Sequence, residues 1–344
     1  MKVALLGFEQ AGKKTFFTLL TGRKIPGALK EDESVEGVAP IRDPRVDVLA
    51  GICKPERKKY AENTLVLCPT IKEGAASRPW LEAARKCDLV CLVVRDFTAD
   101  EVYHPAGSVN AERDRSALES ELLLADLELI EKRLDRMQKE KKGGQTSREA
   151  HEEQVLTHLK TTLEKDMRFV SVSLEPQDLD AIKSLGLLTL KPILWAMNVD
   201  EGKLQGPALP TGVFRVSCRI EQEIMALESE EERAEYLRSL GMESSGLDRL
   251  NQAAYDAMGL MSFYTIGEDE VRAWTIRKGT PAPQAAGKVH TDIERGFIRA
   301  EIIKYDDLVA AGSEAAAKAA GKHQVKGRDY VIEDGDICHF RFNV

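Results

Sequence analysis

The sequence lacks any apolar run approaching the roughly 20 residues that a membrane-spanning helix needs. It opens directly on a short apolar segment, so we expect no signal peptide, no membrane contact and a cytoplasmic location. It also lacks an excess of positive charge, because its net charge is −8. A chain this acidic is not a bulk nucleic-acid binder, and any contact with RNA must use a local basic patch.

Cysteine is sparse, since the chain has six, and only Cys87 and Cys91 lie close together in the sequence. No histidine lies near that pair, which argues against a zinc site. We therefore expect buried, reduced cysteines that fill the core. With 344 residues, of which 43% are hydrophobic and 31% charged, the chain is typical of a soluble globular protein of two or three domains.

What the sequence does have is a phosphate loop at its start. The apolar run Val3–Leu6 is followed by Gly7-Phe8-Glu9-Gln10-Ala11-Gly12-Lys13 and then by a helix-like run from Thr15 to Leu20. This order of strand, glycine-rich loop and helix surrounds a phosphate with backbone N–H groups and a helix N-terminus. Lys13 is predicted to reach the β- and γ-phosphates. The next position should carry a Ser or Thr that binds Mg²⁺, and it is Lys14 here.

Residues 110–168 differ from the rest and predict two long helices. Apolar residues recur at spacings of four, three, four and three, which is the seam of a coiled coil: Leu123, Leu127, Ile130, Leu134 and Met137. The polar stretch Lys139–Ser147 predicts a turn, and a second amphipathic helix follows with Val155, Leu159, Leu163 and Met167. Two helices joined by a short polar turn predict an antiparallel hairpin.

The segments on both sides of this insertion have α/β character. The predicted strands are Gly37–Ile41, Leu65–Cys68, Asp88–Arg95, Pro192–Met197 and Val213–Cys218. The predicted helices are Asp43–Ile52, Trp80–Lys86 and Glu221–Arg238.

Residues 262–344 suit a small α+β roll. The predicted strands there are Val271–Ile276, Phe297–Ile302, Tyr330–Ile332 and Ile337–Phe342, with a helix at Ala310–Gly321. We expect His290 to be packed beside a helix that Thr291 or Asp292 caps, and the alternative is that His290 contacts RNA or a protein partner. With 12 basic and 13 acidic residues, this part gives no electrostatic support for RNA binding.

Motifs along essentially the whole chain match one family together: Gly7–Thr15, Pro40–Arg45, Lys54-Pro55, Leu187–Pro192, Asn198–Glu201, Arg272–Thr275, Gln284–Asp292, Gly296–Ala300 and Phe340–Val344. They resemble the YchF group of Obg-like P-loop NTPases. The resemblance implies an α/β fold: a G-protein-like P-loop domain with a mostly parallel sheet, an inserted antiparallel helical hairpin and a C-terminal TGS domain of ubiquitin-like β-grasp fold. The implied boundaries are 1–109 and 187–261 for the two parts of the G domain, 110–186 for the helical insertion and 262–344 for the TGS domain.

The resemblance also implies binding of ATP or GTP, association with the ribosome, and roles in translation and stress responses. Asn198 and Glu201 stand where an Asn-Lys-x-Asp motif usually reads guanine, and loss of its aspartate relaxes the guanine preference. The implied nucleotide-binding residues are Gly7, Gln10, Ala11, Gly12, Lys13, Lys14, Thr15, Asn198 and Glu201. The implied partners are the nucleotide and a ribosome or RNA, contacted through the TGS domain and the hairpin.

Three departures from the family pattern fall on the side of the site that would hold Mg²⁺. Lys14 replaces a hydroxyl ligand, Glu31 lies near the position of a loop threonine, and Leu67–Thr70 replaces an Asp-x-x-Gly motif. Phosphoryl transfer depends on Mg²⁺ to neutralise charge on the β- and γ-oxygens. We therefore expect hydrolysis to be very weak or absent, assign no catalytic residue and no metal ligand, and leave the use of Mg²⁺ open.

Three alternatives stay open at this point. In the first, the protein binds nucleotide and the Lys14 ammonium replaces part of the metal's charge, so binding survives EDTA. In the second, the chain is a pseudo-GTPase scaffold that binds no nucleotide and acts through its TGS domain and hairpin. In the third, an active ATPase uses Thr15 as a shifted metal ligand, although one helical step turns Thr15 about 100° away from the loop mouth.

Overall fold

The computed structural model describes residues 1–27, 30–140, 144, 146–166 and 174–343. The chain forms two compact units. The first contains Met1–Val38 and Thr64–Leu250, and the second contains Ala39–Asn63 and Asn251–Val344. In the described part of the chain, no helix has both the length and the apolar character needed to span a bilayer.

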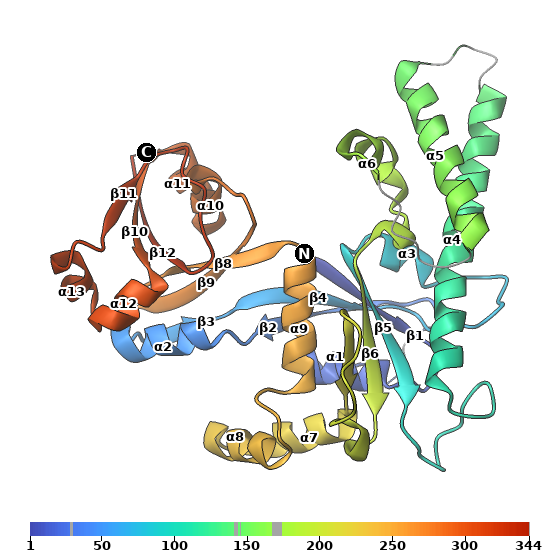
Figure 1. The fold of residues 1–344 in the computed structure, drawn as a ribbon, viewed down its shortest axis with the longest axis horizontal. Coiled ribbons are helices and arrows are strands. Elements are labelled where there is room, and N and C mark those ends of the chain that lie inside the picture. The colour runs from blue at the N-terminus through green and yellow to red at the C-terminus, as the bar shows by residue number, and fades with distance from the viewer. Residues whose placement is uncertain (28–29, 141–143, 145, 167–173, 344) are drawn as a thin grey trace. The chain divides into compact units, whose positions relative to one another are not determined.

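A six-stranded sheet with the order β2-β4-β1-β5-β6-β7 carries the phosphate loop (Figure 1). Its strands are β1 (Lys2–Gly7), β2 (Val35–Ile41), β4 (Ala61–Leu67), β5 (Leu89–Asp96), β6 (Ile193–Val199) and β7 (Val213–Val216). The pairs β4–β1, β1–β5, β5–β6 and β6–β7 are all parallel. The central strands β1 and β5 are buried along nearly their whole length, as parallel strands covered on both faces must be. The predicted P-loop fold with a mostly parallel sheet is confirmed.

Helices follow the strands of this unit. They are α1 (Lys13–Thr21), α3 (Leu81–Arg85), α4 (Ala111–Glu140), α5 (Ser147–Asp166), α6 (Pro176–Ile182), α7 (Cys218–Ala226), α8 (Glu230–Ser239) and α9 (Gly246–Ala257), whose last residues belong to the second unit. Short 3₁₀ turns lie at Lys183–Leu185, Leu188–Leu190 and Glu201–Lys203.

The single helix predicted over Glu221–Arg238 is wrong, because the chain forms α7 and α8 instead. Ser229 starts α8 as a capping box, in which its hydroxyl accepts a hydrogen bond from the Glu232 N–H at 3.1 Å.

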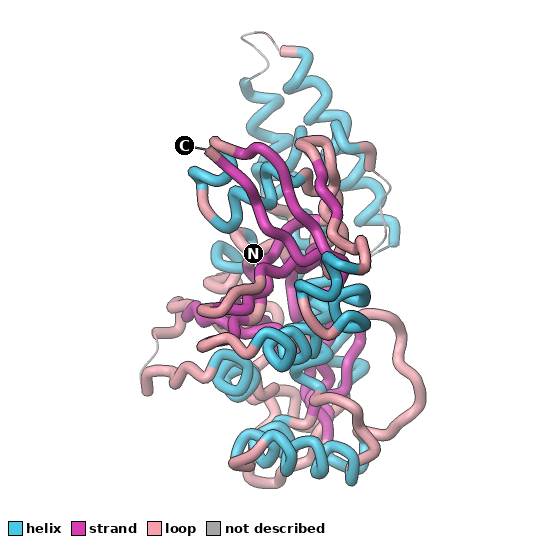
Figure 2. Tube along the Cα trace, turned by 90° about the vertical axis from the view of Figure 1, so that its left-hand side faces the viewer, coloured by secondary structure: helices cyan, strands magenta, loops and turns pink. Residues whose placement is uncertain are grey.

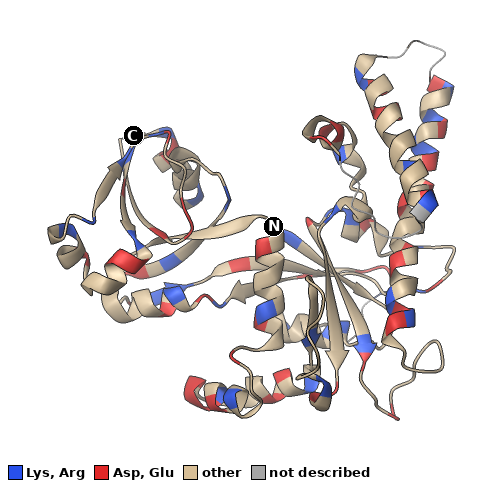
Figure 3. Cartoon of the chain, in the orientation of Figure 1, with Lys and Arg blue, Asp and Glu red and all other residues tan. Residues whose placement is uncertain are grey.

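The predicted helical hairpin is present as α4 and α5, which pack together over an apolar seam (Figure 1). Leu123, Leu127, Ile130 and Met137 of α4 are buried in it with Val155, Leu159 and Leu163 of α5. The pairs Arg133–Glu152 and Glu131–Lys160 cross between the helices and fit an antiparallel arrangement. Charges of both signs alternate on the outer faces (Figure 3). Most of the expected turn and Met167 fall outside the described residues.

The second unit contains another six-stranded sheet, with the order β11-β10-β12-β8-β9-β3. Its strands are β3 (Arg57–Lys59), β8 (Leu260–Thr265), β9 (Glu270–Arg277), β10 (Phe297–Lys304), β11 (Gln324–Lys326) and β12 (Asp336–Phe342). The strands near the C-terminus run side by side in Figure 2, as their antiparallel pairing requires. Its helices are α2 (Pro44–Cys53), α10 (Ala282–Val289), α11 (Thr291–Arg295), α12 (Tyr305–Ala311) and α13 (Glu314–Ala319).

Three local predictions in this unit are wrong. Tyr330–Ile332 is no strand, because Val331 makes one isolated bridge to Pro281. The expected helix at Ala310–Gly321 is two helices, since Gly312 ends α12 at a φ of 72° and Ser313 caps α13. His290 is not packed, because its side chain is 62% exposed and caps α11 by accepting a hydrogen bond from the Asp292 N–H.

Candidate functional site

The phosphate loop connects the end of β1 to the start of α1, and two glycines allow its path. Gly7 has a φ of 151°, and a Cβ there would collide with the Val93 carbonyl oxygen on the neighbouring strand. Gly12 has a φ of 98°, and a Cβ there would collide with the Asn198 side chain. The fully buried rings of Phe16 and Phe17 pack α1 into the core behind the loop. The first N–H groups of α1 have no partner inside the helix and can receive an anion.

Lys13 lies inside this loop and is only 6% exposed. Its ammonium donates a hydrogen bond to the Phe8 carbonyl oxygen at the beginning of the loop. Burial is the main cause that lowers the pKa of Lys13 to about 7; the negative charge of Glu9 partly opposes it, and the positive charge of Lys14 adds to it. The loop therefore keeps a lysine whose charged form a bound anion would stabilise.

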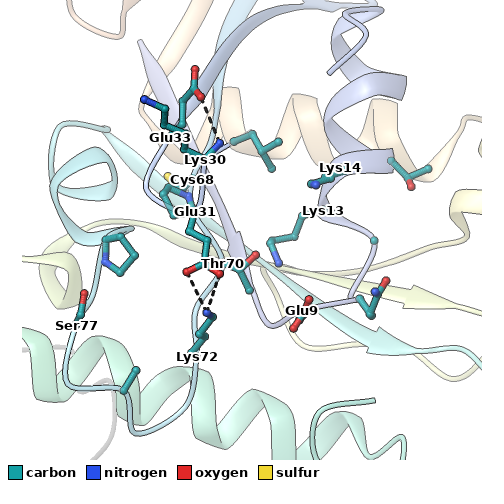
Figure 4. Close-up of a pocket in the computed structure, with 17 residues that line it drawn as sticks. Glu9, Lys13, Lys14, Lys30, Glu31, Glu33, Cys68, Thr70, Lys72 and Ser77 are labelled. Carbon is teal, nitrogen blue, oxygen red and sulfur yellow. Dashed lines mark hydrogen bonds and ion pairs between the residues drawn. The ribbon is translucent and has the colours of Figure 1, made fainter. Parts of the chain in front are cut away.

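A cavity of about 730 Å³ opens beside the loop. Glu9, Gln10 and the start of α1 line one part of it, residues 30, 31 and 33 line another, and the segment after β4 completes it (Figure 4). Its charged lining residues are four lysines and three glutamates: Lys13, Lys14, Lys30, Lys72, Glu9, Glu31 and Glu33. The lining is therefore slightly basic, although the chain as a whole is acidic.

Five of the predicted binding residues line this cavity together: Gln10, Gly12, Lys13, Lys14 and Thr15. The prediction that Thr15 turns away from the loop mouth is wrong, because the cavity extends along the first turn of α1. Gly7 and Ala11 shape the loop without lining the cavity, and Ala11 is 2% exposed.

Asn198 lies at the carboxyl end of β6 and is 4% exposed. Its amide nitrogen donates a hydrogen bond to the Ala11 carbonyl oxygen at 3.1 Å, and its amide oxygen accepts one from the Cys218 N–H at 3.1 Å. Asn198 thus connects the phosphate loop to the start of α7. Its NH₂ group carries a second hydrogen, but Asn198 itself does not line the cavity.

Glu201 is exposed at the start of the 3₁₀ turn Glu201–Lys203 and does not line the cavity. Its neighbours fix that turn, because Asp200 accepts hydrogen bonds from the N–H and hydroxyl of Thr98, and Lys203 contacts Asp96. The structure therefore separates Glu201 from the phosphate side of the site.

The residues present do not fit the Mg²⁺ ion that P-loop NTPases use. The three positions expected on the metal side do lie together, since Lys14, Glu31 and Leu67–Thr70 all line the cavity. In the described residues, however, no three Asp, Glu, His or Cys side chains form a group that would hold a metal. Leu67 is apolar and the Cys68 side chain carries sulfur, so neither supplies the oxygen ligand that Mg²⁺ prefers.

Sequence reasoning missed four charged residues of the cavity: Glu9, Lys30, Glu33 and Lys72. Glu9 lies within the phosphate loop that the sequence predicts, so its place in the cavity could have been inferred from that motif. Lys30 and Glu33 lie in a polar segment that shows no periodicity. Lys72 lies two residues beyond Leu67–Thr70, and the close approach of that segment to the phosphate loop indicates its place in the site.

Comparisons with known proteins show the family to which the chain belongs. The family model YchF-GTPase_C, described as "Protein of unknown function (DUF933)", matches residues 260–343. The ribosome-binding ATPase YchF of Pasteurella multocida is 38% identical over 100% of this chain and 99% of its own length. The chain belongs to the YchF family.

Other YchF-family matches have a similar extent. The ribosome-binding ATPase YchF of Bacillus subtilis is 36% identical, with both chains covered completely, and Obg-like ATPase 1 of Gallus gallus is 35% identical over 100% of this chain and 92% of its own. The solved structure of the Schizosaccharomyces pombe YchF GTPase superimposes with a TM-score of 0.82 at 30% identity, over 99% of this chain and 97% of that one. The YchF architecture therefore extends through the whole chain.

Proposed function

We propose that this protein is a nucleotide-binding, ribosome-associated member of the YchF family whose phosphate site is neutralised by lysine in place of Mg²⁺. The observation that carries the proposal is the lining of the cavity, where the exposed Lys14 follows the buried Lys13 at the start of α1. Two ammonium groups and the N-terminus of α1 there favour a chain of phosphates. The names of the relatives, a ribosome-binding ATPase and an Obg-like ATPase, support the nucleotide and ribosome parts of the proposal.

Hydrolysis is proposed to be weak or lost. A lysine ammonium neutralises charge on bound phosphate, but it cannot orient the β- and γ-oxygens as a divalent ion does. Loss of metal assistance removes several kcal/mol of transition-state stabilisation. Binding and release, without turnover, would then be the activity of the site. We propose that the second amide hydrogen of Asn198 contacts the base, which suits ATP or GTP because both purines offer an acceptor at N7.

The first test is isothermal titration with ATP and GTP in EDTA and again in excess Mg²⁺. We expect binding in EDTA, and Lys14→Ser to weaken metal-free ATP binding about tenfold, the change expected for a lost charge-assisted contact. Lys24→Ser is the matched control, because Lys24 is an exposed lysine outside the cavity. Strict dependence on Mg²⁺ or clear ATP turnover would contradict the proposal, and no binding of any nucleotide would favour the scaffold alternative.

We also propose that residues 262–344 form a TGS domain and that this domain and the helical insertion at 110–186 contact the ribosome or RNA, with the G domain at 1–109 and 187–261. The family resemblance and the relatives' names support the contact with the ribosome. A role in translation and stress responses, in the cytoplasm, is part of this proposal. Co-sedimentation of the purified protein with ribosomes is the expected result. A protein that stays in the supernatant at physiological salt would contradict it.

A further inference from the structure

Lys72 lies on the segment that follows β4 and lines the cavity together with Lys13 and Lys14. We propose that Lys72 is a phosphate-binding residue of this site and that Glu31 competes with bound phosphate for its ammonium. This inference rests on the nucleotide-binding function proposed above. It adds two roles to that function: Lys72 selects for the phosphate chain of the nucleotide, and the Glu31 carboxylate limits the affinity for the nucleotide.

The backbone holds Lys72 close to the phosphate loop. The N–H of the preceding residue, Ile71, donates a hydrogen bond to the Gly7 carbonyl oxygen at 3.2 Å, and the Ile71 side chain is 1% exposed. On the other side of Lys72, the Gly74 N–H donates to the buried Glu121 carboxylate at 2.7 Å. Because the segment is fixed on both sides, the position of Lys72 relative to the loop is defined by main-chain contacts.

The side chains of Lys72 and Glu31 extend toward each other from two segments of the cavity wall (Figure 4). The Lys72 Nζ lies 3.3 Å from both carboxylate oxygens of Glu31. The two side chains are 60% and 87% exposed, so water screens the pair and its separation costs little. A phosphate group carries more charge and more acceptor oxygens than a carboxylate, so it would replace Glu31 as the partner of Lys72.

Glu33 provides an internal comparison. It lines the same cavity and carries the same charge as Glu31, but it accepts a hydrogen bond from the main-chain N–H of Lys30 at 3.4 Å. A general effect of negative charge on affinity would act through both glutamates. Competition for Lys72 acts through Glu31 alone.

The test is a double-mutant cycle in the full-length protein, measured by isothermal titration with ATP in EDTA. We expect Lys72→Gln to weaken ATP binding about fivefold and Glu31→Gln to strengthen it about threefold, as for other partly exposed charge pairs. In the Lys72→Gln background, Glu31→Gln is expected to have almost no effect. Glu33→Gln is the control, and its smaller effect is expected to be the same in both backgrounds. ADP, whose chain is shorter, is expected to lose less affinity than ATP on Lys72→Gln.

Additive effects of the two substitutions, or equal effects of Glu31→Gln and Glu33→Gln, would overturn this inference while leaving nucleotide binding intact. If the wild-type protein and Glu31→Gln both bind no ATP, the proposed function itself fails, and this inference fails with it. Thermal unfolding of every variant checks that the fold is retained. We expect it to be retained in the Lys72 and Glu31 variants, because these two side chains are solvated and are not part of the core.

Discussion

A lysine that is 6% exposed is costly unless something accepts its charge, and Lys13 has one hydrogen-bond partner, the Phe8 carbonyl. The pKa of about 7 expresses that cost, because burial disfavours the ammonium relative to the neutral amine. An arriving phosphate reverses the balance by giving the ammonium an anionic partner. Binding and protonation at Lys13 are therefore coupled.

This coupling predicts proton uptake when nucleotide binds at alkaline pH. At pH 8 free Lys13 is mostly neutral and becomes an ammonium in the complex, so nearly one proton is expected to be taken up per ATP bound. Affinity should accordingly fall as pH rises above 7. Titration calorimetry at pH 8 in Hepes and in Tris measures the uptake from the difference in apparent enthalpy.

The control for this measurement is the same pair of titrations at pH 6, where Lys13 already carries its proton and uptake should nearly vanish. Enthalpies that agree between the two buffers at pH 8 would show that Lys13 does not change its protonation on binding. The free protein is expected to show the matching trend in stability. Because the pKa of Lys13 is lower in the folded than in the unfolded chain, the free energy of unfolding should rise as pH increases from 7 toward 10.5.

Among the elements, the α4–α5 hairpin has the most regular relation between sequence and structure. Its seam is a narrow apolar stripe, and the ion pair Arg133–Glu152, with N–O distances of 2.7 and 2.9 Å, lies along its side. Charged faces of this kind contribute little to stability, so the buried seam must hold the hairpin together.

Truncation within the seam is therefore expected to be costly. Ile130 is fully buried between the two helices, so Ile130→Ala should lower the free energy of unfolding by about 3 kcal/mol through lost burial and the cavity left behind. Leu124→Ala on the same helix is the control, because Leu124 is 40% exposed. Urea denaturation followed by circular dichroism measures both, and equal effects would contradict the packing described here.

The elements that sequence predicted correctly are those with strong periodicity or continuous burial, such as β5, the hairpin seam and α2 after its Asp43 cap. The wrong predictions concern helix ends and strand pairing, which the periodicity of apolar residues does not determine. The break between α7 and α8 depends on the Ser229 capping box. Tyr330–Ile332 contains three residues typical of strands, but it forms only an isolated bridge, between Val331 and Pro281. β8 was missed although most of its residues are apolar or aromatic, because its limits depend on pairing with β9.

The candidate site was predictable where residues follow one another in sequence, as in Gly7–Thr15. The rest of the cavity lining, from residues 30–33 and from the segment after β4, was only partly predictable. The family resemblance indicated Glu31 and Leu67–Thr70, but Lys72 is placed by the hydrogen bond from the Ile71 N–H to the Gly7 carbonyl, which joins positions far apart in the sequence. The role of Asn198 as a link between the loop and α7 also depends on tertiary contacts.

At the scale of the whole molecule, the second unit is built from two separate pieces of chain. Residues 39–63 supply α2 and β3, and β3 pairs with β9 as an edge strand of the sheet. Arg45 fixes the first piece to the second, because its guanidinium contacts Asp43 at 3.0 Å and Asp334 at 2.7 Å. Asp334 also accepts a hydrogen bond from the Ser262 N–H at 3.1 Å.

Loss of Arg45 is expected to weaken the second unit as a whole. Arg45→Met would leave the mostly buried Asp43 without its cation, and we expect the unit to lose about 2 kcal/mol of stability. Arg57→Met is the matched control, because Arg57 is 72% exposed and its ion pair with Glu270 should contribute about 0–1 kcal/mol. Hydrogen exchange of amides in β8 and β12 measures the difference, and comparable protection in the two variants would contradict a special role for Arg45.

The divided construction of the second unit has a consequence for biosynthesis. Residues 39–63 leave the ribosome early, and the intervening residues 64–250, about 190 in number, must be made before Asn251 appears. At about 5–20 residues per second, this takes about 10 to 40 s. During that time Val46 and Leu49 of α2, both fully buried in the finished protein, have no sheet to cover them. The nascent chain therefore exposes the apolar residues of α2 to solvent while residues 64–250 are being made. It can complete its second unit only after residues 251–344 have emerged.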